Sequence, residues 1–154
     1  MNKRIVGILI LVVLTGCWRI HRDLSNSPLY SNVIGKQYKT KAELVVYRLS
    51  KNEYGSLSPF GSGPIPPTEE LKAKPFPYRY YDTKVLGILP VGSVLEIVKV
   101  TEEGATNNAF VFYYTKVAQS SDPQWIGQIN DVIDFTVNRD PLKLNPAIAE
   151  EIVP

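Results

Sequence analysis

The chain has 154 residues, with 17 basic and 15 acidic side chains, one cysteine and one histidine. This length suits one domain with a short additional segment. The basic excess equals Lys3 and Arg4 of the extreme N-terminus, so the rest of the chain is formally neutral. A nucleic-acid-binding protein needs a basic face, and this balance argues against one. A single cysteine excludes an intramolecular disulfide and a zinc site built on several thiolates.

The N-terminus has the pattern of an export signal. A short basic segment, residues 2–4, precedes an apolar run over residues 5–14 that only Gly7 interrupts. Ten helical residues rise about 15 Å, which is half the hydrocarbon thickness of a bilayer. The run is therefore too short for an ordinary membrane-spanning helix, and it has the length of the apolar part of a signal peptide.

The run ends in Leu14-Thr15-Gly16-Cys17, which resembles the lipobox of bacterial lipoproteins. The resemblance implies a signal peptide over residues 1–16 and a mature chain that begins at Cys17, whose thiol carries diacylglycerol and whose amine is acylated. Lipid chains on Cys17 would make the membrane a partner of the protein. The family pattern, with Trp18 in place of aspartate after the cysteine, implies the outer membrane facing the periplasm in a cell with two membranes. The alternative is a free or buried cysteine after an ordinary signal peptide.

Residues 17–32 mix charged, polar and scattered apolar side chains, a composition that predicts a tether lifting the domain off the membrane. The single histidine, His21, lies in this stretch. We expect its side chain to be solvated, because a lone histidine in a tether has neither a metal nor a catalytic partner nearby in the sequence.

Residues 33–138 have the composition of a mainly β domain. Strand patterns rich in β-branched and aromatic residues cover 41–49, 84–89, 94–100 and 109–117, with further strand material at 125–129 and 132–137. A polar hairpin loop is predicted over residues 102–108. No long stretch keeps a helical period, and short strands at this spacing are typical of a small barrel or a small β-sandwich.

Three segments of this domain resemble bacterial Src-homology-3-like (SH3-like) domains. Residues 85–97 are similar to the family's central hairpin, in which a strand ends in a leucine (Leu89), a glycine turn follows (Gly92), and an alternating strand comes next. Residues 110–117 match the following strand, and Trp125-Ile126-Gly127 is similar to the late tryptophan segment. The resemblance implies an SH3-like barrel, with the β-sandwich as the alternative.

A long insert rich in proline and glycine, residues 50–82, separates the first two predicted strands. It has no clear strand pattern, although residues 68–72 predict one helical turn capped by Thr68. Long loops in compact domains are often functional, and this one ends in aromatic residues. The candidate ligand-binding residues are Tyr78, Arg79, Tyr80, Tyr81 and Trp125. Tyrosine rings stack on sugars or grip peptides and Arg79 would pair with a carboxylate; the alternative is that the rings cover an open end of the barrel.

After residue 138 the sequence predicts a short C-terminal helix within residues 139–154. Asn145 is placed to cap it, Pro146 to occupy its first position, and Leu144, Ile148 and Ile152 to form an apolar stripe. We expect this helix to close the barrel, and the alternative is a docking segment for a partner.

The sequence contains no catalytic motif, and we predict no catalytic residue, cofactor or metal. Asp122, Asp131 and Asp134 lack the oxygen spacing of a calcium loop. We therefore favour a non-catalytic, lipid-anchored binding module of the bacterial envelope, for peptidoglycan or an envelope protein. The alternative is an inhibitor or immunity lipoprotein against a lytic enzyme or toxin. An envelope enzyme built on Glu96, Asp131 and Asp134 is least favoured, because general bases are so few.

Overall fold

The computed structural model of the protein describes residues 19–105, 108–139 and 142–153. Strands make up 52% of the residues and helical turns 12%, which confirms the prediction of a mainly β protein. The predicted signal peptide and Cys17 lie outside the described residues. Within the described part, no helix is long and apolar enough to cross a membrane.

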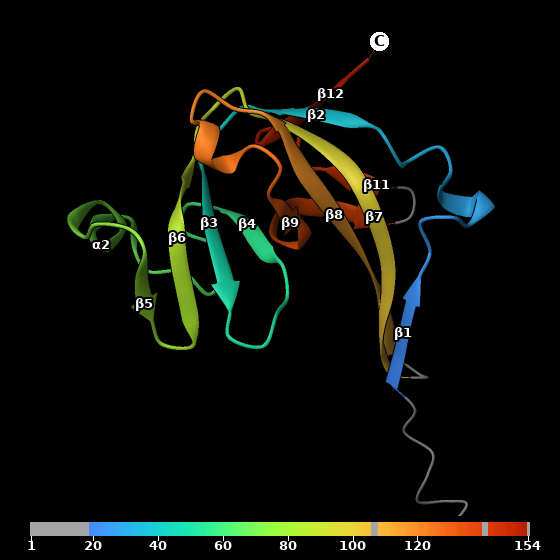
Figure 1. Ribbon diagram of the computed structural model, residues 1–154, viewed down its shortest axis with the longest axis horizontal. Coiled ribbons are helices and arrows are strands. Elements are labelled where there is room, and N and C mark those ends of the chain that lie inside the picture. The colour runs from blue at the N-terminus through green and yellow to red at the C-terminus, as the bar shows by residue number, and fades with distance from the viewer. Residues whose placement is uncertain (1–18, 106–107, 140–141, 154) are drawn as a thin grey trace, which may run out of the picture.

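One large sheet curls into a half-barrel, and a two-stranded sheet lies beside it (Figure 1). The large sheet has the strand order β12-β2-β7-β8-β9-β4-β3-β6-β5, and β1 joins it by pairing with β7. Its neighbours are antiparallel except β4 and β9, which are parallel. The strands of the large sheet are β1 (Arg19–Asp23), β2 (Gln37–Thr40), β3 (Leu44–Leu49), β4 (Gly55–Pro59), β5 (Tyr78–Tyr80), β6 (Thr83–Leu89), β7 (Val94–Ala105), β8 (Asn108–Gln119), β9 (Ile129–Asp131) and β12 (Ala149–Ile152).

The remaining elements are short. The small sheet pairs β10 (Thr136–Arg139) with β11 (Leu142–Leu144), and single turns of helix lie between the strands. These are η1 (Pro28–Tyr30), α2 (Thr68–Ala73), η2 (Pro123–Trp125) and η3 (Ile133–Phe135).

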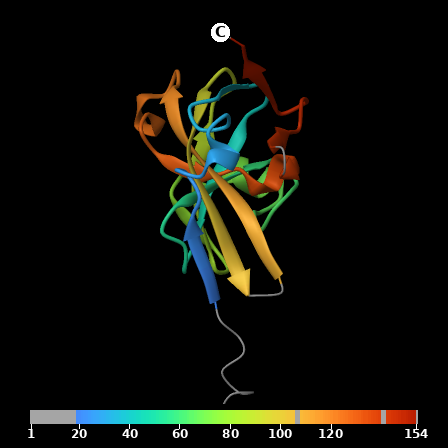
Figure 2. The same cartoon turned by 90° about the vertical axis from the view of Figure 1, so that its right-hand side faces the viewer.

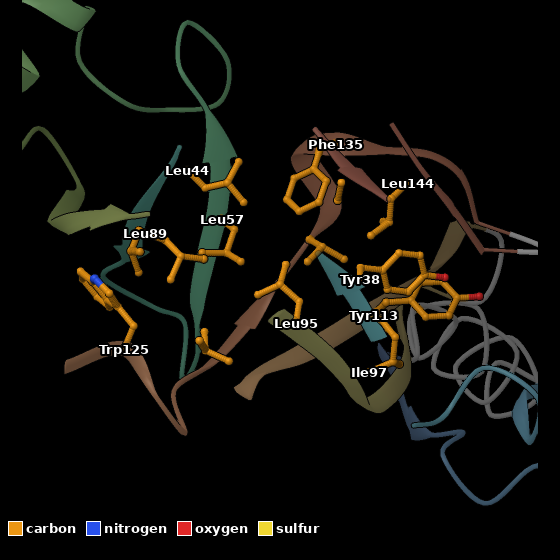
Figure 3. Packing of buried hydrophobic residues seen from close by; sticks show 14 of the residues in the cluster. Tyr38, Leu44, Leu57, Leu89, Leu95, Ile97, Tyr113, Trp125, Phe135 and Leu144 are labelled. Atoms are coloured by element: carbon orange, nitrogen blue, oxygen red, sulfur yellow. The ribbon is translucent and has the colours of Figure 1, made fainter. Parts of the chain in front are cut away.

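The core lies inside the curl of the large sheet. Figure 3 shows Leu44, Leu57 and Leu89 on one side of it and Leu95 and Ile97 on the other, and all five are fully buried. Two short elements outside the large sheet, η3 and β11, close the core with Phe135 and Leu144. Apolar residues on facing strands thus meet across the curl, as the hydrophobic effect requires.

The stretch predicted to be a tether, residues 17–32, is folded where it is described. All five residues of β1 pair with residues 101–105 of β7, and η1 follows with Ser27 as its cap. One ion pair adds to this pairing, with 3.6 Å between Arg22 Nη1 and Glu102 Oε2, and His21 Nδ1 lies 3.7 Å from Glu103 Oε1. β7 continues to residue 105, through much of the predicted hairpin loop. It does so because β1 supplies hydrogen-bonding partners along the outer edge of β7 over residues 101–105.

The insert over residues 50–82 contains β4, α2 and β5, so it is ordered structure and not one long loop. The predicted helical turn is confirmed as α2, but Thr68 lies inside the helix and Pro67 holds the cap position without a side-chain hydrogen bond. Leu71 of α2 packs with Val45 and Val85 in a second, smaller core on the other face of the sheet.

A strand takes the place of the predicted C-terminal helix. Asn145 Oδ1 accepts a hydrogen bond from the Ala147 backbone N–H at 3.0 Å, and the chain turns over residues 146–148. Residues 149–152 then pair with β2 as β12. The Asn-Pro signal therefore starts a turn, and the unpaired edge of β2 takes the following residues into the sheet.

Candidate functional site

The three tyrosines predicted to bind a ligand do not form one surface of the β5–β6 hairpin. Tyr78 and Tyr80 pack on the small core around Leu71, so these two rings cover apolar residues of that core. The Tyr78 hydroxyl is buried without a hydrogen-bond partner, and this burial raises the pKa of the phenol. Tyr81 is 82% exposed in the turn after β5, with a left-handed φ of 50°. Arg79 is also exposed, and its Nε donates to the Tyr81 carbonyl at 3.0 Å.

Trp125 lies apart from these residues, in η2, and only 2% of it is exposed. Its indole packs against Gly87 of β6, where a Cβ atom would stand 2.7 Å from Cζ2 and 2.9 Å from Cη2. The indole Nε1 is buried and has no hydrogen-bond partner. Trp125 is therefore a packing residue between η2 and β6, and little of its ring is open to a ligand.

A groove beside Trp125 is the largest hollow described on the molecule, with a volume of about 620 Å³. We call it the side groove. It lies where η2 and the start of β9 approach β3, β6 and the loops after β3 and before β5. Its lining residues are Arg48, Tyr54, Pro77, Leu86, Gln124, Trp125, Gly127, Gln128 and Ile129.

The polar side chains of the side groove include two amides, one cation and the phenol of Tyr54. Gln124 Nε2 donates to Asp122 Oδ2 at 2.5 Å, and Gln128 Nε2 donates to the Gln124 carbonyl at 2.9 Å, so η2 holds both side chains in place. Arg48 is exposed and makes no ion pair within the described part of the chain. The groove therefore combines apolar walls with a fixed amide pair and a free guanidinium, which suits a peptide that carries a carboxylate.

Arg48 also belongs to a row of three basic residues across neighbouring strands, which we call the basic row. The register places Arg48 of β3 opposite Lys84 of β6, and Lys84 opposite Arg79 of β5. Neighbouring strands lie about 4.8 Å apart, and like charges directly opposite each other destabilise a sheet. Lys84 and Arg79, like Arg48, have no ion pair with a described residue.

The basic row lines a second hollow of about 430 Å³. The acidic residue in its lining is Asp82, and apolar surface comes from Pro77 and Tyr78. The sequence alone identified Arg79 but missed Arg48 and Lys84, because only the pairing of three strands places them together.

A third hollow, of about 330 Å³, separates β1 and β7 from the loop between β3 and β4. Two of its three carboxylates, those of Glu103 and Asp131, are already bonded within the protein, and the third is Glu53. Glu103 Oε1 accepts from the Thr101 hydroxyl at 2.8 Å and from the Tyr114 hydroxyl at 3.0 Å. Asp131 Oδ2 accepts from the Ser56 hydroxyl at 2.5 Å, and burial raises the pKa of this carboxyl.

The carboxylates considered for catalysis or calcium have separate partners. The Asp134 carboxylate accepts a hydrogen bond from the Tyr47 hydroxyl at 2.8 Å. Glu96 Oε2 lies 3.7 Å from Nζ of Lys116, the residue opposite it on β8. Asp122 caps η2 by accepting from the Gln124 backbone N–H. Among the residues that the structure describes, no group of three or more His, Cys, Asp or Glu is placed to hold a metal ion.

Comparisons with protein-family models, with curated proteins and with solved structures found no significant match. The side groove and the basic row are therefore interpreted from their own geometry and chemistry.

Proposed function

We propose that the protein is a lipid-anchored, non-catalytic binding module of the bacterial envelope, with Cys17 as its anchor and the side groove as its binding site. Its ligand would be a carboxylate-bearing peptide, either the peptide of peptidoglycan or an acidic segment of an envelope protein. In a cell with two membranes, the anchor would place it in the outer membrane facing the periplasm.

The free guanidinium of Arg48 in the side groove is the observation that carries this proposal. A groove of about 620 Å³ has the size of sites that bind small molecules or short peptide segments. Arg48 would hold a carboxylate through two parallel hydrogen bonds. Gln124 and Gln128 would offer amide groups to the peptide backbone, and Leu86 and Pro77 apolar contact.

The SH3-like assignment belongs to the same proposal. The supporting feature is the β6–β7 hairpin, which ends its first strand at Leu89 and turns at Gly92 with a φ of 81°. β8 then pairs with β7 along nearly its whole length. The proposed binding site does not depend on any other feature of SH3-like domains.

The proposal is tested by sedimenting the lipidated protein, in detergent, with purified peptidoglycan sacculi. We expect it to sediment with intact sacculi and to lose this binding when an amidase has removed the peptides. Arg48→Gln should weaken binding at least tenfold, because it removes the charge that pairs with the carboxylate. The matched control is Lys116→Gln, an exposed cation outside the groove whose partner is Glu96.

Chemical crosslinking in cells separates the two ligand classes. A crosslinker installed at Gln124 should capture one defined envelope protein if the ligand is an acidic protein segment. Absence of both sacculus binding and a specific crosslinked protein would contradict the proposed function.

A further inference from the structure

The position of β1 fixes which end of the domain is nearest to the anchor. Only Trp18 lies between Cys17 and the first residue of β1, Arg19. Two residues of extended chain span at most about 7 Å. With Cys17 lipidated, as the proposed function requires, the N-terminal end of β1 must therefore lie within the headgroup region or just above it.

Two other parts of the chain lie at that same end of the molecule. Figures 1 and 2 show the start of β1, the loop between β3 and β4 and the turn between β5 and β6 at one end, and the C-terminus at the opposite end. Because β6 runs away from its turn with β5, its seven residues separate Tyr81 from the β6–β7 turn by about 23 Å. One end of the domain thus faces the membrane, and Val91 in the β6–β7 turn lies far from it.

The end that faces the membrane is basic. Arg48 is the fifth residue of the six in β3 and Lys84 is the second residue of β6, so both lie close to this end, and Lys51 follows in the loop after β3. The guanidinium of Arg79 reaches the turn, where its Nε bonds to the Tyr81 carbonyl. The acidic side chains in these two connections are Glu53 and Asp82. At the same end Glu102 and Glu103 of β7 lie opposite Arg22 and His21 of β1, so the excess of cations is confined to the β3, β5 and β6 side.

The turn also presents an aromatic side chain to the outside. Tyr81 is 82% exposed, and its ring meets the Tyr80 ring edge-on with 4.7 Å between the centroids. Tyrosine is enriched at the depth of lipid headgroups, where its ring is apolar and its hydroxyl meets water. An exposed ring beside free cations is the combination expected of a surface that rests on anionic lipid.

We propose that Arg79 and Lys84 of the basic row, together with Lys51 and Tyr81, dock on the anionic phospholipid headgroups of the membrane that holds the anchor. This proposal rests on the lipidation of Cys17 within the proposed function. The domain then stands on the membrane in one orientation, the headgroup phosphates balance Arg79 and Lys84, and Arg48 stays available to the ligand of the side groove. Arg48 lies where this membrane surface meets the side groove.

The test measures depth and orientation in lipid nanodiscs that contain the full lipidated protein. Because acylation uses the only cysteine of the chain, a second cysteine takes a nitroxide label selectively. The reporter is Asn52→Cys in the loop after β3, a neutral exposed position, and the control is Val91→Cys, which is 54% exposed at the opposite end. Collisions with oxygen and with a water-soluble nickel chelate, measured by electron paramagnetic resonance, give the depth of each label.

With 30% phosphatidylglycerol in the disc, we expect the label at residue 52 to be shielded from nickel at least threefold more than the label at residue 91. The double variant Arg79→Gln, Lys84→Gln should lower this difference to the smaller value that the anchor alone gives in discs of neutral lipid, and Tyr81→Ser should also reduce it. All three residues are exposed, so these variants should stay folded, and the double variant should be at least as stable as the parent because it removes two like charges that lie opposite each other. Equal shielding of both labels, or a difference in shielding that is just as large in discs of neutral lipid alone, would overturn the docking proposal.

The outcomes separate this proposal from the proposed function. Protein that stays in the discs and binds sacculi, but shows equal shielding, would retain the binding module and reject the docking. Shielding that appears only when an acidic peptide is added would assign the basic row to that peptide and would also reject the docking. Protein that does not remain with the discs would reject the anchor and both proposals.

Discussion

The contact between Trp125 and Gly87 joins the floor of the side groove to the core, and Gly87→Ala tests it directly. A methyl group at residue 87 would stand 2.7 Å from Cζ2 of the indole, closer than carbon atoms approach in packed proteins. Trp125 is 2% exposed, so the ring cannot move away without disturbing its neighbours. Overpacking of this kind costs about 1–3 kcal/mol of unfolding free energy. For a protein of this size the cost corresponds to a loss of about 3–9 °C in Tm.

A double-mutant cycle separates the steric effect from other causes. Trp125→Phe removes both clashing carbons and leaves space, so in that background Gly87→Ala should lose the steric cost and keep only the backbone cost of an alanine at a φ of 157°. The coupling free energy should be about 1–3 kcal/mol. Gly35→Ala is the control for backbone effects, since Gly35 has a φ of 84° and a methyl group there would meet no atom of a non-neighbouring residue within 4 Å. Thermal unfolding followed by circular dichroism measures all variants, and an equal loss for Gly87→Ala in both backgrounds would refute the packing described here.

Three further predictions concern buried side chains. Leu57→Ala should cost about 2–5 kcal/mol in urea unfolding, because Leu57 is fully buried between the two walls of the core; a cost below about 1 kcal/mol would contradict this core. Tyr47→Phe should cost about 1.5–3 kcal/mol, since it removes the hydrogen bond to the Asp134 carboxylate, and it should cost much less in an Asp134→Ala background. Burial raises the pKa of Asp131 above 3.8, so the folded state binds this proton more tightly than the unfolded state. Native stability should therefore rise relative to Asp131→Asn as the pH falls from 7 towards 4, and the reverse slope in a pH series of urea unfolding would contradict the raised pKa.

The strands that could be predicted from the sequence are those whose signal is local. β6, β7 and β8 alternate apolar with polar residues or are rich in β-branched and aromatic side chains, and each lies where the pattern predicts it. α2 was equally predictable, because a single helical turn depends on hydrogen bonds between neighbours in the sequence. Such elements need no knowledge of their partners.

The strands that were missed depend on partners far away in the sequence. β1, β5 and β12 consist largely of polar residues, and each becomes a strand by completing an edge of the large sheet. β4 has the sequence GSLSP, yet Ser56 and Ser58 are buried because Asp131 and the Ser62 carbonyl bond their hydroxyls. Composition alone identifies such a segment as a loop, since the hydrogen bonds that stabilise it are non-local.

The candidate site follows the same rule. Arg79 stands among tyrosines and was identified from the sequence, whereas Arg48 and Lys84 are isolated basic residues in strand-like segments. A register shift between Val46 and Tyr47 in the β3–β6 pairing sets which residues of β3 share a face with Lys84. Because one step of register moves a side chain to the other face of a sheet, no pattern in the sequence could place these three cations together.

The pairing of β1 with β7 changes how the anchor would act in this protein. A flexible tether of about fifteen residues would let the domain turn freely and meet ligands at a distance from the membrane. With Cys17 lipidated as proposed, a strand that enters the sheet two residues later would remove that freedom and keep the side groove close to the bilayer. The basic row would then serve to select one of the few orientations that remain, and the groove would meet its ligand from the side. For a module held in this way, a ligand that itself lies near the membrane, such as an acidic segment of an envelope protein, is easier to reach than one that lies deep in the periplasm.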